Sequence, residues 1–168
     1  IFPKTEGSDL NGVFTFTTLD DAKAIDKFLG KSSKKKVKAV VIGGGLIGVS
    51  VTEALVKRKV GVTVVEMRER ILNVILDETA SALGAEAVKK AGVKIITGHT
   101  VTRITGDAAG NVAGAVLDDG KELLCDMVLV AIGVQPRTEL VKDTAIKINR
   151  GIVVDRHMAT SSPDVYAC

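Results

Sequence analysis

The sequence predicts an α/β fold built on a parallel sheet, and three observations support this prediction. Between Val37 and Ile96, short β-branched apolar runs alternate with segments whose apolar residues recur at helical spacing. Strands and helices that alternate in this way form parallel sheets with right-handed crossovers. Three short strands separated by turns follow, which indicates an inserted antiparallel meander. Glycine, at 17 of 168 residues, and an aromatic content of only 3% suit a core of small branched side chains.

The composition excludes several other classes of protein. Apolar residues make up 46% of the chain and charged residues 26%, which are ordinary values for a globular domain. A chain of 168 residues is long enough for one sizeable hydrophobic core. No apolar run approaches the length of about 18 residues that a membrane span needs, so we expect no membrane partner and, by default, a cytoplasmic location. The chain does not begin with Met, and we expect it to belong to a longer protein.

Nucleic-acid and metal binding are also not expected. The net charge of +3 is modest, and much of the lysine excess lies in the segment 31–38, which we interpret as a solvated connection. The chain lacks the aromatic rings on which single-stranded bases stack. Cys125 and Cys168 are too distant for a CxxC motif, and His99 and His157 are too few to predict a metal site. No Ser, Cys or His comes with a recognisable base and orienting partner, so no catalytic residue is predicted.

The two ends of the sequence differ from its middle. Residues 1–36 are interpreted as a lead-in, with a strand at Val13–Thr17 and a helix that is capped by Asp20 or Asp21 and runs to about Leu29. Residues 137–168 are interpreted as a separate short unit. In this unit we expect a polar helix or turn, a strand at Ile152–Val154 and the start of another strand at Val165.

The main domain, residues 37–136, contains the alternating elements and the meander. One helix follows the first strand directly, and a second is predicted over about Asp77–Lys90. The last strand is fully apolar, so we expect it to return to the parallel sheet. The predicted strands lie at Val37–Ile42, Val62–Glu66, Val93–Ile96, Val101–Thr105, Val112–Leu117, Glu122–Leu124 and Met127–Ile132.

A glycine-rich segment between the first strand and the first helix carries the strongest functional signal. Its residues are Gly43, Gly44, Gly45, Leu46, Ile47 and Gly48. An acidic residue, Glu66, ends the next strand 23 positions after Gly43 (66 − 43). The dinucleotide-binding fingerprint of a Rossmann-like sheet has the same order: a strand, a GxGxxG segment, a helix, and a second strand that ends at an acidic residue. With the meander on its other face, the sheet is expected to form a three-layer β/β/α arrangement.

Each part of the fingerprint has a physical task. We expect Gly43 to make the tight turn, Gly45 to leave room for a pyrophosphate, and Gly48 to let the helix pack on the strand. The helix N-terminus attracts the phosphates with its free N–H groups. Glu66 can accept hydrogen bonds from the adenosine ribose, which favours NAD over NADP because its charge repels a 2′-phosphate. Arg68 and Arg70 can weaken that preference by pairing with the phosphate.

Two alternatives for the glycine segment remain open. The glycines can serve helix–strand packing alone, without any ligand. A methyltransferase with a related glycine loop is the second alternative.

Three runs of the sequence together resemble one family. These are Val40–Gly48, Val64–Glu66 and Val128–Pro136, and they are similar to the pyridine nucleotide–disulfide oxidoreductase flavoproteins. The resemblance is strongest to the branch with NADH oxidase, rubredoxin reductase, nitrite reductase and coenzyme A disulfide reductase, and it extends from about Val13 to Cys168. It implies an NADH-binding domain at 37–136 between two strips of an FAD-binding domain, and it implies these cofactor-binding residues: Gly43, Gly44, Gly45, Leu46, Ile47, Gly48, Glu66, Met67, Arg68, Ile132 and Gly133.

The resemblance also implies what the chain lacks. The run 159–168 is similar to the segment that leads into the family's second FAD motif, and the first FAD motif and the redox-active cysteines are not in this sequence. We therefore expect FAD in the intact protein but little or none on this chain, which would not turn over alone. Its expected partner is the missing FAD-binding portion, and exposed apolar surface makes a homo-oligomer possible.

The resemblance also concerns residues expected near the nicotinamide. The family commonly has Glu two positions after the last glycine of the fingerprint, where this chain has Ser50, and Glu53 lies nearly one helical turn further on. The sequence leaves open which of them takes that role. Gly133 and Pro136 follow the last strand and match the family motif, so we expect backbone there to approach the cofactor.

A different class of function remains as the alternative. A Rossmann module that senses NAD without transforming it would share the glycine segment and Glu66. It would have no need of the meander or of the run from Gly133 to Pro136, and these features favour the oxidoreductase.

Overall fold

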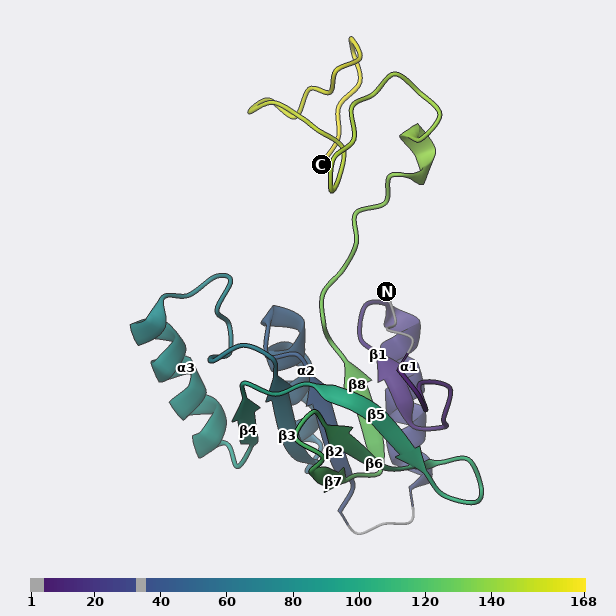
Figure 1. Cartoon of the computed structure of the whole chain (residues 1–168), viewed down its shortest axis with the longest axis vertical. Helices are drawn as coiled ribbons and strands as arrows, with labels where there is room; N and C mark the ends of the chain where they lie inside the picture. Colours follow the sequence, from purple (N-terminus) through teal and green to yellow (C-terminus); the bar gives the residue numbers. More distant parts are fainter. Residues whose placement is uncertain (1–4, 33–35) are drawn as a thin grey trace. The chain divides into compact units, whose positions relative to one another are not determined.

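The computed structural model describes residues 5–32 and 36–168. The described chain divides into two compact units, residues 5–133 and residues 134–168. Figure 1 shows the order of the elements along the chain.

The first unit is built on a five-stranded parallel sheet with the order β1-β8-β2-β3-β4. Its central strands are short and consist almost wholly of Val, Ile, Leu and Ala, as expected where both faces of a sheet are covered. The strands are β1 (Val13–Thr15), β2 (Lys38–Ile42), β3 (Gly61–Glu66), β4 (Lys94–Thr97) and β8 (Met127–Val130).

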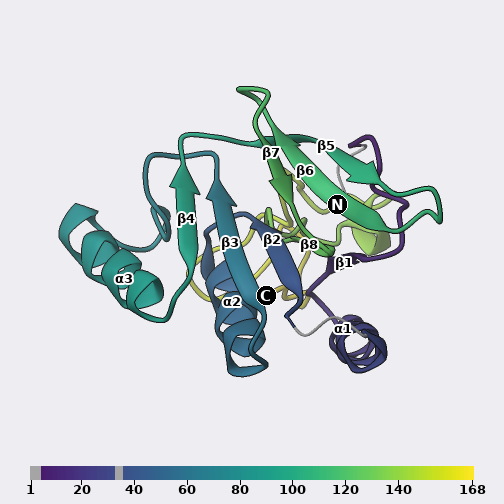
Figure 2. The ribbon, with the colours of Figure 1, turned by 90° about the horizontal axis from the view of Figure 1, so that it is seen from below.

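Helices cover one face of this sheet, and a second sheet covers the other (Figure 2). The helices are α1 (Leu19–Lys31), α2 (Leu46–Lys57) and α3 (Glu78–Lys90), and the antiparallel sheet consists of β5 (Val101–Gly106), β6 (Val112–Leu117) and β7 (Glu122–Leu124). Successive strand residues point to opposite faces. Thus Val41 lies in the core with α1 and α2, whereas its neighbour Val40 lies in the core with β5 and β6. The predicted three-layer α/β fold is confirmed.

The sequence-based boundary at residue 36 differs from the structure. β1 pairs in parallel with β8, and Phe14 and Ile25 pack into the same core as Val41. Residues 5–32 are therefore part of the sheet domain and not a separate lead-in. The change of sequence pattern at Val37 suggested a boundary there, because the pairing of β1 with β8 joins segments far apart in the sequence and leaves no local signal.

The cap of the α1 helix is Thr18, two to three residues before the predicted cap at Asp20 or Asp21. The Thr18 hydroxyl accepts the Asp21 N–H at 3.2 Å, and the Asp21 carboxylate accepts the Thr18 N–H at 3.0 Å. This reciprocal pair is a capping box. The helix then continues through Gly30 to Lys31, two residues beyond the predicted end.

The second unit, residues 134–168, contains little regular structure. A 3₁₀ turn at Glu139–Val141 takes the place of the predicted polar helix or turn. The predicted strand at Ile152–Val154 is wrong, because only isolated bridges join Ile148 to Ile152 and Ala159 to Tyr166. A short run of Ile and Val forms a strand only where a partner strand lies beside it. Within the described ranges, no helix combines the length and apolar character needed to span a bilayer.

Candidate functional site

The glycine-rich segment joins β2 to α2 at the carboxyl ends of the parallel strands, where ligands of open α/β sheets bind. Three of its four glycines are required by the fold itself. Gly43 has φ +104°, and a Cβ there would lie 2.5 Å from the Ala131 carbonyl oxygen. A Cβ at Gly44 would lie 2.6 Å from Cγ2 of Ile71, and one at Gly48 would overlap the Gly43 carbonyl oxygen.

Gly45 is different from the other three glycines. It has an extended backbone with φ −78° and ψ −169°, which any residue adopts, and no heavy atom lies within 4 Å of an added Cβ. Neither conformation nor packing within the chain explains a glycine here. Open space at this position is what a pyrophosphate against the loop requires, so the residues present fit a dinucleotide.

The N-terminus of α2 adds backbone donors to the candidate site. Gly45 is its N-cap and has no side chain to bond the first-turn N–H groups, and no acidic residue lies in that turn. These donors and the helix dipole favour an anion beside Leu46 and Ile47. The Leu46 side chain is largely exposed, whereas Ile47 packs against the helix-side core.

Glu66 is buried and connects two parts of the site. Its Oε2 atom accepts the N–H of Gly44 at 2.6 Å, and its Oε1 atom accepts the N–H of Arg68 at 2.8 Å. The carboxylate thus fixes the glycine loop and the end of β3 through the backbone, a role that spacing alone did not reveal. A carboxylate has about four acceptor positions, so two backbone donors leave capacity for ribose hydroxyls.

The residues after Glu66 divide into exposed and enclosed groups. Met67 and Arg68 are exposed, and within the described ranges the Arg68 guanidinium has no hydrogen-bond or ion-pair partner. Arg70 is half-buried, its Nη2 atom donates to the Leu76 carbonyl at 3.4 Å, and its buried Nε atom has no partner in the described chain. Arg68 is therefore placed to meet a charged ligand, whereas Arg70 belongs to the loop itself.

The other candidate residues lie at the end of β8 and on α2. Ala131 donates its N–H to the Ile42 carbonyl, which places the chain leading to Ile132 and Gly133 beside the glycine loop. Ile132 is exposed, and Gly133 has φ +112° with open space around it. On α2, Ser50 is exposed, and Glu53 is engaged by Lys57 at 2.7 Å, whose hydrogen bond lowers the pKa of that carboxyl.

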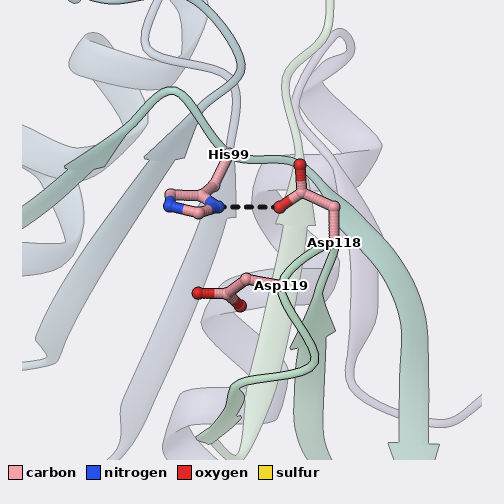
Figure 3. A group of neighbouring side chains, drawn as sticks. All are labelled: His99, Asp118 and Asp119. Carbon is pink, nitrogen blue, oxygen red and sulfur yellow. Dashed lines mark hydrogen bonds and ion pairs between the residues drawn. The ribbon is translucent and has the colours of Figure 1, made fainter.

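A polar cluster lies beside the strand ends, outside the predicted site (Figure 3). His99 follows β4 and donates its backbone N–H to the Glu66 carbonyl at 3.3 Å. Its Nδ1 atom lies 2.8 Å from an Asp118 carboxylate oxygen in the β6–β7 turn, and Asp119 is adjacent. The His99 bond lowers the pKa of Asp118. Because all three side chains are exposed or half-buried, we interpret this cluster as a surface link between the two sheets.

The structure adds three residues that the sequence did not single out. Ile71, Leu72 and Ser81 contact the glycine loop or support residues that do. Leu72 has φ +55°, a conformation that a leucine in sequence does not signal.

Comparison with known proteins identifies relatives across almost the whole chain. The NADH oxidase of Methanocaldococcus jannaschii is 37% identical over 166 residues, which is 98% of this chain and 36% of that protein. The rubredoxin-NAD(+) reductase of Ectopseudomonas oleovorans is 34% identical, and the match covers 96% of this chain and 41% of that protein. The chain thus spans about two fifths of the length of these relatives.

A solved structure extends the comparison to the fold. The NAD-dependent persulfide reductase from A. fulgidus superimposes with a TM-score of 0.87 and is 34% identical. The match covers 99% of this chain and 30% of that one. The sequence pattern of one family matches residues 1–168, and the chain belongs to the pyridine nucleotide-disulphide oxidoreductases.

Proposed function

We propose that this chain is the NADH-binding part of a longer flavin-dependent oxidoreductase. The observation that carries the proposal is the open space at Gly45, next to an uncapped helix N-terminus. The fold explains the other three glycines of the loop, and a bound pyrophosphate would explain this one. Family membership supports the same reading.

The residues of the site would divide the work of binding. The first turn of α2 and the loop 43–48 would hold the pyrophosphate through backbone N–H groups. Glu66 would hold the loop in shape and accept the ribose hydroxyls with its remaining lone pairs. Ile132 and Gly133, next to the glycine loop, would bound the nicotinamide end.

Hydride transfer needs a second cofactor beyond this site. When bound, NADH supplies a hydride, and the FAD of the longer protein would pass the electrons to oxygen, a disulfide or a redox protein. We propose that this chain holds little or no FAD and does not turn over alone. A stoichiometric flavin absorbance in the purified chain would overturn that part of the proposal.

The proposal includes a preference for NADH over NADPH. The buried Glu66 carboxylate would repel a 2′-phosphate at the end of β3. The exposed Arg68 guanidinium would reduce the difference without removing it, because its interaction with a phosphate is screened by solvent.

A calorimetric titration of this chain with NADH and with NADPH tests the proposal. We expect saturable NADH binding, weaker NADPH binding, and weaker binding of both nucleotides by Gly45→Ala. Absence of binding by either nucleotide, or unchanged affinity in Gly45→Ala, would contradict the assigned site.

A further inference from the structure

Gly44 is held through its N–H and its carbonyl by the end of β3 and by the segment that follows it. Its N–H donates to Glu66 Oε2 at 2.6 Å, and its carbonyl accepts the N–H of Leu72 at 2.8 Å. Both bonds join positions more than 20 residues apart in the sequence. Because Gly44 precedes the helix N-cap Gly45, its orientation determines where the loop presents its backbone donors.

The Ile71 side chain packs directly against Gly44. Its side chain is almost fully buried, and its Cγ2 atom is the nearest heavy atom to the space a Gly44 side chain would occupy. Leu72 adopts a left-handed conformation with φ +55°, which is unfavourable for a leucine. Such a conformation persists only where the surroundings determine it, and such positions concentrate at functional sites.

A residue outside the glycine loop holds this segment in place. Ser81, in the first turns of α3, is 1% exposed, and its hydroxyl donates to the Ile71 carbonyl at 2.6 Å. The bond fixes the backbone between the buried Ile71 side chain and the Leu72 N–H. A continuous series of contacts therefore runs from α3 through Ile71 and Leu72 to Gly44.

We propose that Ser81 is a positioning residue for dinucleotide binding, which acts through Ile71 and Leu72 to preset the Gly44 peptide. This inference rests on the proposed function, and it assigns a role in binding to a helix that does not itself contribute to the glycine loop. Ser81 makes its contribution before any cofactor arrives, because every contact in the series lies within the chain.

Ser81→Ala tests the proposal against a matched control, Asp77→Ala. Asp77 caps the same helix by accepting the Ala80 N–H at 2.8 Å, so its loss weakens α3 without touching the series of contacts to Gly44. We expect Ser81→Ala to raise the Kd for NADH about fivefold to tenfold, and Asp77→Ala to change it by no more than about twofold.

Backbone amide exchange supplies a readout of the loop itself. In the cofactor-free chain, NMR should show faster hydrogen exchange at Gly44 and Leu72 in Ser81→Ala than in Asp77→Ala. If Ser81→Ala does not fold, Ser81→Cys keeps the size of the side chain but offers only a weak S–H donor to the Ile71 carbonyl, and it should give a smaller change of the same kind.

The results distinguish a failure of the Ser81 role from a failure of the proposed NADH-binding function. NADH binding to the unsubstituted chain, with equal Kd and equal amide exchange in the two α3 variants, would overturn the role of Ser81 alone. If NADH does not bind the unsubstituted chain, the proposed function fails and the positioning role fails with it.

Discussion

The carboxylate of Glu66 accepts the backbone N–H of Gly44 at 2.6 Å, across 22 positions of sequence. Glu66, the acidic residue of the fingerprint, therefore also stabilises the glycine loop. A second bond, to the Arg68 N–H, fixes the chain just beyond β3. Substitutions of Glu66 therefore change two things at once, the shape of the loop and the proposed recognition of the ribose.

Titration of Glu66→Ala with two nucleotides separates these contributions. We expect its affinity for NADH to fall by about 1.4–3 kcal/mol, tenfold to somewhat over a hundredfold, because charged hydrogen bonds are lost. NADPH should lose less, because removal of the carboxylate also relieves its repulsion of the 2′-phosphate. Calorimetry with both nucleotides measures the difference, and an equal loss for the two would refute the role of Glu66 as the selector. Urea unfolding should also show a lower stability, because the Gly44 N–H loses its partner.

Replacing either of two glycines of the same loop by alanine should have different effects on stability and on NADH affinity. Gly45→Ala should fold with a stability within about 1 kcal/mol of the parent, because a Cβ there meets no atom within 4 Å. Its affinity for NADH should fall about tenfold or more, because the methyl group enters the pyrophosphate space. Gly48→Ala should instead lose about 3 kcal/mol or more of stability, because its Cβ would overlap the Gly43 carbonyl. Urea unfolding and calorimetry of both variants provide the check, and a Gly45→Ala chain that binds normally would contradict the site.

The sequence predicted the parts of the fold that depend on periodicity and on turn residues. β-branched runs located the central strands, and Asp77 and Gly92 correctly bracketed α3. The place of β1 in the sheet was not predictable in this way, because three half-buried residues pair with β8 through non-local contacts. The strand expected at Ile152–Val154 is wrong for the converse reason, since an isolated bridge from Ile152 to Ile148 takes the place of a paired strand.

The shape of the glycine loop was predictable from the sequence where it depends on backbone requirements. Gly43 and Gly48 are needed for a positive φ and a close helix contact, so they appear in the sequence as glycine. The Glu66 bond to Gly44 depends on a side-chain rotamer, and the Leu72 conformation depends on its surroundings. Neither feature can be recognised in the sequence pattern. For this reason Ile71, Leu72 and Ser81 were identified only from the structure.

The two arginines after β3 should respond differently to truncation. Arg68→Ala should weaken NADPH binding more than NADH binding, by a difference of about 0.5–1 kcal/mol, because an exposed guanidinium can pair with a 2′-phosphate. Arg70→Ala should lower stability without changing the ratio of the two affinities, because Arg70 is part of the loop. Competition titrations with both nucleotides measure the ratio, and an identical ratio in the parent and in Arg68→Ala would contradict this assignment.

The two cysteines should differ sharply in reactivity. Burial raises the pKa of the Cys125 thiol to about 12, with Asp126 and Glu122 adding to the shift, whereas Cys168 is exposed. The thiolate is the reactive form, so Cys125 should remain inert near neutral pH. A thiol-reactive dye should label one cysteine per native chain and two after unfolding. Cys168→Ser serves as the control, because its native chain should not react at all, and rapid labelling of that variant would show that Cys125 is accessible.

The capping box of α1 should give the domain a measurable acid sensitivity. Partial burial raises the pKa of Asp21, but hydrogen bonds from Thr17 and Thr18 outweigh this effect, and the net pKa lies below the ordinary value of 3.8. When the pKa of a carboxyl is lower in the folded chain than in the unfolded chain, the ionised carboxylate stabilises the folded state. This stabilisation is complete above the unfolded-state pKa, and it is lost as the pH falls through the folded-state pKa.

Asp21→Asn isolates this contribution from those of the other carboxyl groups. The variant should be less stable than the parent by about 1 kcal/mol at pH 7, since the amide offers a weaker acceptor to the Thr17 and Thr18 donors. The difference should shrink steadily below about pH 4 and disappear once Asp21 is protonated, because a neutral carboxyl and an amide are then nearly equivalent. Urea unfolding at a series of pH values measures it, and a difference that stays constant with pH would show that the Asp21 charge does not stabilise α1.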